Sequence, residues 1–154
     1  MKKDSPGIKF PPPLYYIFAF FIAIYIQRFV PVENIFFNNW SVKIAGIFIL
    51  GISLFFLIPS ILQFARTKNT LVTILPATSL QTNGIYRITR NPMYLGLVIA
   101  YAGITCIAGN WWSASFLIIL IFLQNLIIIK EEKYLEREFG QQYLDYKQKV
   151  RRCF

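Results

Sequence analysis

Four long apolar runs divide this chain, and polar segments separate them. The runs cover about residues 14–31, 42–64, 92–108 and 111–129. A helix needs about 20 mostly apolar residues to cross the hydrocarbon core of a bilayer, so each run predicts one transmembrane helix. Only Gly109-Asn110 separates the last two runs, which predicts an antiparallel hairpin. We therefore expect an all-α, polytopic membrane protein with four spans.

The first run is expected to remain in the mature protein. A cleaved signal sequence has a short apolar core that is followed by small residues. This run instead ends with Gln27, Arg28 and Phe29, none of which is small. The segment is therefore interpreted as a retained membrane helix.

Two longer segments depart from the apolar pattern. Residues 65–91 combine basic residues with scattered Leu, Ile and Val, which predicts a functional, ordered loop. Asn91-Pro92 predicts the start of the third span, because Asn favours the N-cap and Pro favours the first turn. After Lys130, apolar residues recur at spacings of three and four. These residues are Leu135, Phe139, Tyr143, Tyr146 and Val150. The spacing predicts an amphipathic C-terminal helix over residues 131–150 at the membrane surface.

Composition supports a membrane location and predicts an orientation. Hydrophobic residues make up 56% of the 154 residues and charged residues 15%, whereas soluble domains average about 25% charged. The net charge is +9, and Lys and Arg concentrate in the N-terminal segment, the 65–91 loop and the C-terminal segment. The positive-inside rule places both termini and this loop on the cytoplasmic side of a single domain, residues 1–154. The cations are interpreted as contacts with membrane lipids, not with nucleic acid.

The residue types that are missing narrow the chemistry. The chain has no His, which excludes a Ser-His-Asp triad, a Cys-His pair and a His-ligated metal site. The two cysteines, Cys106 and Cys153, do not have the spacing of metal ligands, so no metal is expected. No Gly-x-Gly follows a strand pattern, and nothing predicts a Rossmann-type cofactor domain.

Polar and aromatic residues on the predicted cytoplasmic side could form one site. They are Tyr86, Arg87, Arg90, Asn91, Tyr94, Glu131 and Glu132. A helix start offers free N–H groups and a positive dipole end, and aromatic faces attract a sulfonium. A plainer alternative is that the arginines anchor the protein, Asn91 caps a helix, and the acids are solvated. Acids at a helix C-terminus oppose the helix dipole, which favours a functional role for this pair.

Two motifs in this region resemble the signature of one enzyme superfamily. The first is Gly84-x-Tyr86-x-x-x-Arg90-Asn91-Pro92-x-Tyr94-x-Gly96. The second is Glu131-Glu132-x-x-Leu135-x-x-x-Phe139-Gly140-x-x-Tyr143-x-x-Tyr146. Together they are similar to the isoprenylcysteine carboxyl methyltransferase and phospholipid methyltransferase superfamily, in its prokaryotic form. The resemblance covers about Thr70 to Val150, and the first two spans match only as generic hydrophobic helices.

The resemblance implies a membrane-embedded methyltransferase that uses S-adenosylmethionine. The positions that match the family's cofactor contacts are Thr78, Ser79, Leu80, Gln81, Tyr86, Asn91, Pro92, Met93, Tyr94 and Glu131. Arg90 is expected to fix an anionic group of the cofactor or of the acceptor. Glu132 is expected to receive a proton if the acceptor is an amine. Isoprenylcysteine members usually carry His where this chain has Asn91, and the eukaryotic ones carry Arg where it has Ile127.

The methyl acceptor stays open at this stage. The resemblance implies a lipophilic molecule that reaches the cofactor from the lipid side, such as an isoprenoid carboxylate, a lipid or a hydrophobic small molecule. Two other functions also stay open. One is a nicotinamide-dependent membrane reductase of related architecture, and the other is a non-enzymatic membrane protein on the same scaffold.

Overall fold

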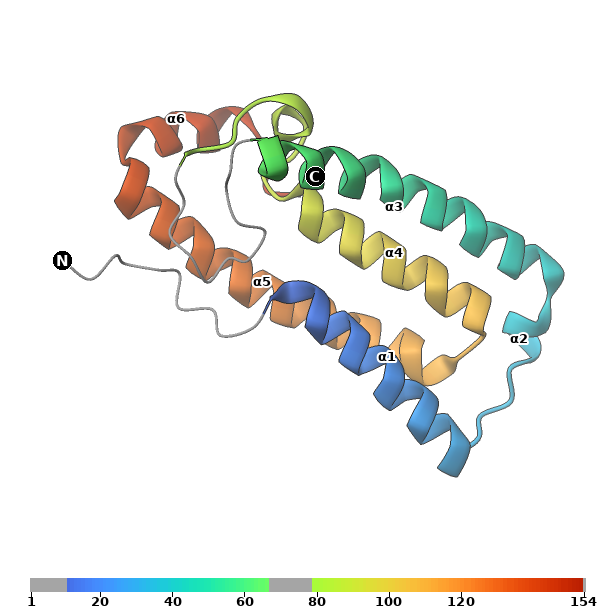
Figure 1. Ribbon diagram of the computed structural model, residues 1–154. Coiled ribbons are helices and arrows are strands. Elements are labelled where there is room, and N and C mark those ends of the chain that lie inside the picture. The colour runs from blue at the N-terminus through green and yellow to red at the C-terminus, as the bar shows by residue number, and fades with distance from the viewer. Residues whose placement is uncertain (1–10, 67–78, 154) are drawn as a thin grey trace.

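The computed structural model describes residues 11–66 and 79–153, and every regular element within these ranges is helical. The elements are α1 (Pro12–Phe29), α2 (Ile35–Asn38), α3 (Trp40–Arg66), the 3-10 helix η1 (Gly84–Arg87), α4 (Pro92–Ala108), α5 (Trp111–Phe139) and α6 (Gln141–Lys149). The all-α prediction is therefore confirmed for the described part of the chain (Figure 1).

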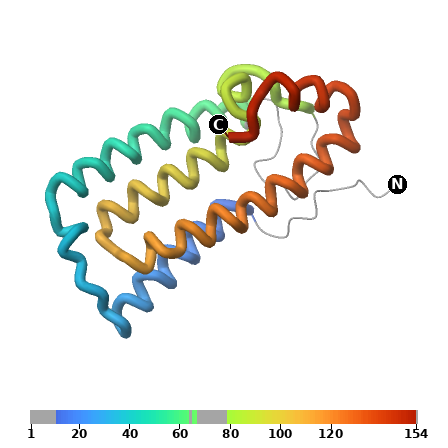
Figure 2. The backbone as a smooth tube through the Cα atoms, turned by 180° about the vertical axis from the view of Figure 1, so that it is seen from behind, coloured from blue at the N-terminus to red at the C-terminus, as the bar shows by residue number. Residues whose placement is uncertain are grey.

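Within the described residues, the long helices α1, α3, α4 and α5 run side by side, with short elements at both ends (Figures 1 and 2). The most extensive packing is between α3 and α4, and α1 packs against α5. Contacts of α4 with α5 and with α1 join these two pairs. The short helix α2 lies at one end, whereas η1 and α6 lie at the other. Segments that are distant in the sequence therefore meet at the end that carries η1 and α6.

Each predicted apolar run corresponds to one helix, but several boundaries differ. The first helix ends at Phe29 instead of residue 31, and the short helix α2 was not expected. The separate helix predicted over residues 131–150 is wrong, because α5 continues to Phe139 and only α6 is independent. Gly140 makes the break, since its φ of 51° lies in the left-handed region that residues with a side chain rarely adopt. The loop predicted over residues 65–91 contains η1.

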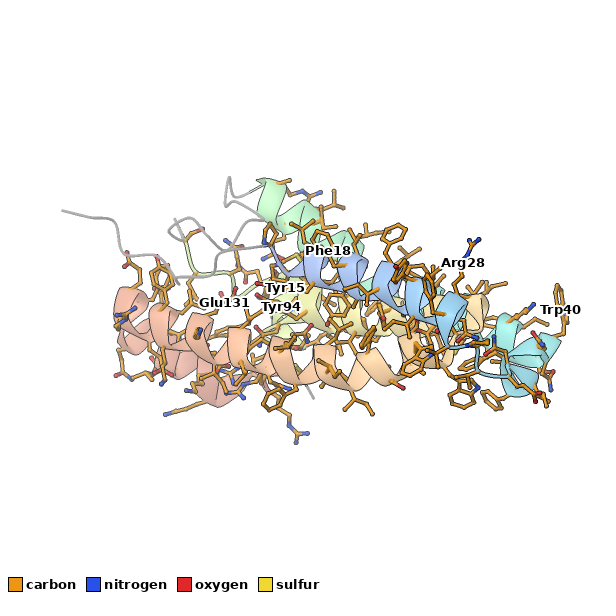
Figure 3. All side chains as sticks on the ribbon, turned by 90° about the horizontal axis from the view of Figure 1, so that it is seen from below. Tyr15, Phe18, Arg28, Trp40, Tyr94 and Glu131 are labelled. Atoms are coloured by element: carbon orange, nitrogen blue, oxygen red, sulfur yellow. The ribbon has the colours of Figure 1, made fainter. Side chains whose placement is uncertain are left out.

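The long helices direct many large apolar side chains outward. Phe48, Phe55 and Phe122 are each at least 60% exposed, and Figure 3 shows the side chains all around the helices, with Phe18 and Trp40 labelled. A soluble domain buries most residues of this kind, so such a surface indicates contact with lipid. Within the described residues, α3 and α5 are long and apolar enough to cross a membrane, and α4 is a shorter apolar helix.

A buried polar contact holds α1 against α5. The Tyr16 hydroxyl donates a hydrogen bond to Oε1 of Gln124, and both side chains are buried. The ring of Tyr101 on α4 meets the Tyr16 ring edge-on, with centroids 5.7 Å apart. An unpaired polar group is costly in an apolar interior, so this hydrogen bond favours one packing of the helices over alternatives.

The helices α3 and α4 approach each other closely where Gly46 faces Gly103. A Cβ atom added to Gly46 would lie 2.8 Å from the carbonyl oxygen of Gly103. A Cβ atom added to Gly103 would lie 2.9 Å from the carbonyl oxygen of Gly46. Because the atoms in the way belong to the backbone, they have little freedom to move aside. Small residues at a crossing let two membrane helices approach, as observed here.

We expect Gly103→Ala to lower the free energy of unfolding by about 1–3 kcal/mol, because the added methyl group forces α3 and α4 apart. Thermal unfolding of the purified protein in detergent micelles would measure the loss. Gly51→Ala is the matched control, since a Cβ at Gly51 on α3 meets nothing within 4 Å. Equal midpoints for the two variants would contradict the close approach.

Candidate functional site

Several segments meet at the end of the molecule that carries η1 and α6. They are η1, the start of α4, the last turns of α5, the helix α6 and residues 150–153 (Figures 1 and 2). The chain starts α4 here because Pro92 occupies its first turn and has no N–H to leave unpaired. The predicted start of the third helix is therefore confirmed.

The two motifs come into direct contact through Tyr94 and Glu131. The Tyr94 hydroxyl donates a hydrogen bond of 2.6 Å to Oε1 of Glu131, and the Tyr94 side chain is buried. Figure 3 shows the two residues facing each other from α4 and α5. The predicted meeting of the central segment with the paired acids is thus present in the structure. One carboxylate and one aromatic ring lie together at this point.

Tyr86 lies near the same acid. It is buried in η1, and burial is the main reason that its pKa is raised above the usual value for tyrosine. A hydrogen bond with Ser60 on α3 lowers the pKa of Tyr86, whereas the charges of Tyr146 and Glu131 raise it. The 3-10 helix that carries Tyr86 directly precedes the start of α4, which carries Tyr94.

Glu132 faces a different set of partners from those of Glu131. Its side chain is 6% exposed and forms an ion pair with Nη1 of Arg90 at 3.1 Å. Arg152 donates two further hydrogen bonds to the same carboxylate, from Nε at 3.0 Å and from Nη2 at 2.6 Å. Both oxygens of Glu132 are therefore engaged by guanidinium groups. Its expected role as a proton acceptor stays a prediction.

The Arg90 side chain is held through its Nη1 atom, whereas its buried Nε has no hydrogen-bond partner among the described residues. The side chain is 8% exposed, and its Nη1 also donates to the Tyr143 hydroxyl at 3.3 Å. A buried donor such as this Nε–H is unusual in a folded protein and marks a place where an acceptor group would be stabilised.

The start of α4 is tied to the residues that follow α6. The side chains of Thr89 and Asn91 both donate to the carbonyl oxygen of Arg152, at 2.9 and 3.1 Å. The backbone N–H of Arg90 donates to the carbonyl oxygen of Arg151 at 3.0 Å. Asn91 does occupy the N-cap position, but its side chain makes no capping hydrogen bond, because it serves this other contact.

Aromatic residues of α6 cover the site from outside. The Tyr146 hydroxyl donates to the carbonyl oxygen of Tyr86 at 2.6 Å, and both residues are buried. Burial, reinforced by the charge of Glu132, raises the pKa of Tyr143 to about 12, although Arg90 opposes the shift. Both tyrosines therefore act as protonated packing residues at neutral pH, with the Tyr146 hydroxyl donating a hydrogen bond and the Tyr143 hydroxyl accepting one from Arg90.

The predicted segment before Tyr86 lies partly within the described residues. Thr78 lies outside them, whereas Ser79, Leu80 and Gln81 are half-buried. Gln81 donates from Nε2 to Oγ of Ser79 at 2.9 Å and accepts from Nε2 of Gln63 at 3.1 Å. These bonds connect the segment to the end of α3. Pro92 and Met93 are buried in the first turn of α4, beside Tyr94.

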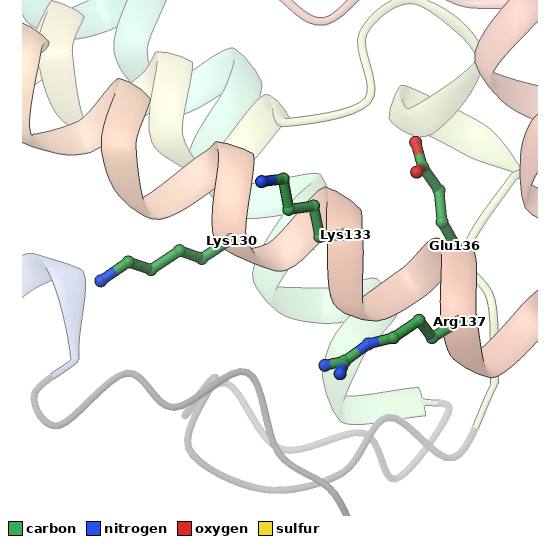
Figure 4. A pocket seen from close by; sticks show the side chains of 4 residues that line it. All are labelled: Lys130, Lys133, Glu136 and Arg137. Carbon is green, nitrogen blue, oxygen red and sulfur yellow. The ribbon is translucent and has the colours of Figure 1, made fainter.

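A cavity of about 540 Å³ opens on the face of α5 where the two acids end its apolar stretch. It is lined by Lys130, Lys133, Glu136 and Arg137 (Figure 4). Lys147 of α6 contacts the Glu136 carboxylate, so that acid is already paired. The lining therefore carries an excess of positive charge that suits an anionic group. The described residues contain no cluster of acids and cysteines that could hold a metal ion.

Sequence reasoning missed two contributors to this site. Arg152 lies after the second motif, where a basic residue is normally interpreted as a membrane anchor. Thr89 lies inside the first motif at an unspecified position. One feature of the sequence could have pointed to Arg152. A buried acid needs a cationic partner, and two adjacent acids follow the apolar stretch of α5. The first motif specifies only one arginine, Arg90, so a second cation was to be expected elsewhere.

Comparisons with known proteins show the family to which this sequence is similar. The family profile of phospholipid methyltransferases matches residues 42–142, which run from α3 into α6. Protein-S-isoprenylcysteine O-methyltransferase B of Arabidopsis thaliana is 38% identical over 72 residues, 46% of this chain and 36% of the plant protein. An uncharacterized protein of Haemophilus influenzae is 43% identical over 63 residues, 39% of this chain and 97% of that protein. The chain thus spans about a third of the plant relative's length. No solved structure matches.

We expect Tyr146→Phe to lower the free energy of unfolding by about 1–3 kcal/mol, because the buried carbonyl of Tyr86 then loses its donor. Thermal unfolding in detergent would measure this effect. Tyr25→Phe is the control, since Tyr25 is 65% exposed on α1. An unchanged midpoint in Tyr146→Phe would show that α6 does not depend on this hydrogen bond.

Proposed function

This chain belongs to the phospholipid methyltransferase family, and from that premise we propose that it transfers a methyl group from S-adenosylmethionine to a lipophilic acceptor at the cytoplasmic membrane surface. The active site is the cluster around Tyr94 and Glu131. The proposed topology has α1, α3, α4 and α5 as four membrane-crossing helices of a single domain, residues 1–154. Both termini and the site then lie on the cytoplasmic side, as the distribution of Lys and Arg favours.

The hydrogen bond between Tyr94 and Glu131 is the observation that carries this proposal. It joins the first motif to the second across 37 positions of sequence. A site that binds one molecule through both motifs requires this proximity. Solvated charges at the ends of two unrelated helices would not require it, and the plainer interpretation of these residues is therefore less favoured.

The methyl donor carries a sulfonium, an ammonium, a carboxylate and ribose hydroxyls, and the residues at the site offer a partner for each. Glu131 suits the hydroxyls or the ammonium, and the rings of Tyr86 and Tyr94 suit the sulfonium. The proposed binding residues are Thr78, Ser79, Leu80, Gln81, Tyr86, Asn91, Pro92, Met93, Tyr94 and Glu131. The described members of this set lie in the segment 79–94 and at the end of α5.

Arg90 gives a separate indication that an anionic group is bound. Its buried Nε has no partner among the described residues, while its Nη1 is held by Glu132 and Tyr143. A guanidinium fixed in this way presents its Nε–H in one direction. We propose that this donor orients a carboxylate or phosphate of the bound donor or acceptor.

Methyl transfer requires the protein mainly to position the donor and the acceptor. S-adenosylmethionine, when bound, supplies a methyl group that is already activated for in-line displacement. The chain's own residues hold the two reactants in line and exclude water, which buried residues such as Met93 and Tyr94 are placed to do. A carboxylate acceptor needs no base. For an amine acceptor, Glu132 is the candidate to receive the proton, and it would release one guanidinium contact to do so.

The acceptor is proposed to be a lipid-type molecule. The outward apolar surface of the long helices places the site beside lipid tails. The cavity lined by Lys130, Lys133 and Arg137 lies at the end of the apolar part of α5, where lipid headgroups gather. Its positive charge favours an acceptor that carries a phosphate or carboxylate.

We expect Glu131→Gln to weaken binding of S-adenosylhomocysteine by about tenfold, or about 1.4 kcal/mol, because a charged acceptor of hydrogen bonds is lost. Tyr94→Phe should weaken it less, since only the hydroxyl that orients Glu131 is removed. Calorimetric titration of detergent-purified protein would measure both. Glu138→Gln is the matched control, because Glu138 is exposed on the same helix.

Two results would contradict the proposal. One is the absence of S-adenosylhomocysteine binding in the parent protein, and the other is equal affinity in all three variants. Binding of NADPH in place of the methyl-donor product would point to a reductase instead. Incubation of membranes with a radiolabelled methyl donor, followed by separation of the lipids, would then identify the acceptor.

A further inference from the structure

Residues 150–153 form an irregular segment after α6, which we call the C-terminal strap. Val150 ends α6 in an extended conformation, with φ −122° and ψ 131°. The strap then passes next to the start of α4, where residues 89–91 bond to it. It lies beyond residues 42–142, the part that matches the family profile.

The strap bonds to three consecutive residues, Thr89, Arg90 and Asn91. Two side chains donate to the carbonyl oxygen of Arg152, and one backbone N–H donates to the carbonyl oxygen of Arg151. These three residues directly precede Pro92, which begins α4. The strap is therefore hydrogen-bonded to the segment directly before α4, within about one helical turn of Tyr94.

The Arg152 side chain acts on the other half of the site. Its two hydrogen bonds to the Glu132 carboxylate fix both oxygens, and one of these oxygens also pairs with Arg90. Bidentate guanidinium–carboxylate pairs restrict orientation as well as distance. Glu132 is the neighbour of Glu131 on α5, so this contact also limits how the end of α5 can turn.

One residue thus holds both sides of the Tyr94–Glu131 pair. Its carbonyl group bonds to the segment before α4, and its guanidinium bonds to α5. We propose that Arg152 is a positioning residue for the methyl-donor site: it keeps α4 and α5 at the separation that lets Tyr94 and Glu131 meet. This inference rests on the proposed function for the identity of the ligand, but not for the contacts.

The test compares Arg152→Gln with Arg151→Gln, which removes the same charge one residue earlier. The Arg151 side chain is exposed, and only its carbonyl oxygen contacts the site. Two readouts are needed on the intact protein in detergent. Hydrogen–deuterium exchange of residues 84–95 reports the order of the segment before and within α4, and titration with S-adenosylhomocysteine reports the site.

We expect Arg152→Gln to speed exchange across residues 84–95 and to weaken S-adenosylhomocysteine binding by about tenfold, because a small displacement of the binding groups is costly. Arg151→Gln should change neither readout. Arg152→Lys keeps the charge but cannot form the bidentate pair, so it should fall between the parent and Arg152→Gln. If Arg152→Gln fails to fold, the lysine variant provides the comparison.

Each outcome decides a different point. Equal exchange and equal affinity in the variants at Arg151 and Arg152 would overturn the positioning role. Weakened binding that follows only a general loss of stability, with faster exchange in all helices, would overturn it as well. A parent protein that binds no S-adenosylhomocysteine would refute the proposed function, and the exchange measurement would still decide whether the strap orders the start of α4.

Discussion

The arrangement of the site depends on the buried carboxylate of Glu132. An ionised acid is costly to bury unless cations pair with it and satisfy its oxygens. The two guanidiniums that do so come from different parts of the chain, Arg90 before α4 and Arg152 after α6. Pairing one charge therefore draws three segments together. Glu131 directly precedes Glu132 on α5, so the pairing of Glu132 with the two arginines also brings Glu131 within reach of Tyr94.

The two adjacent acids consequently serve different purposes. Successive residues on a helix point about 100° apart, so Glu131 and Glu132 cannot share one set of partners. Glu132 is enclosed by arginines and organises the protein, whereas Glu131 meets a tyrosine hydroxyl and is only half-buried. In the proposed membrane arrangement, this polar cluster lies at the boundary between lipid and water. Such a boundary is where a polar cofactor and a lipid-soluble acceptor can both be reached.

The sequence predicts the helices well and the site only in outline. Apolar runs locate α1, α3, α4 and α5 because apolar residues continue along most of each of these helices. Placing both motifs on one side of the membrane predicts that Tyr94 and Glu131 could meet. It does not predict which acid meets which partner, since that depends on the rotation of α5 about its axis. The sequence did not predict a role for Arg152 in the site, because a basic residue after a surface helix is normally interpreted as a membrane anchor.

The length of α5 has a consequence for the lipid environment. Its 29 residues form one helix of about 43 Å, whereas the hydrocarbon core of a bilayer is about 30 Å thick. Taken as a membrane-crossing element, α5 carries its two acids about 30 Å from its start, at the edge of the hydrocarbon core, and continues without a joint until Gly140. A thicker or thinner bilayer would change the tilt of this rod through hydrophobic mismatch. The depth of the carboxylates relative to the headgroups would then follow the composition of the host membrane.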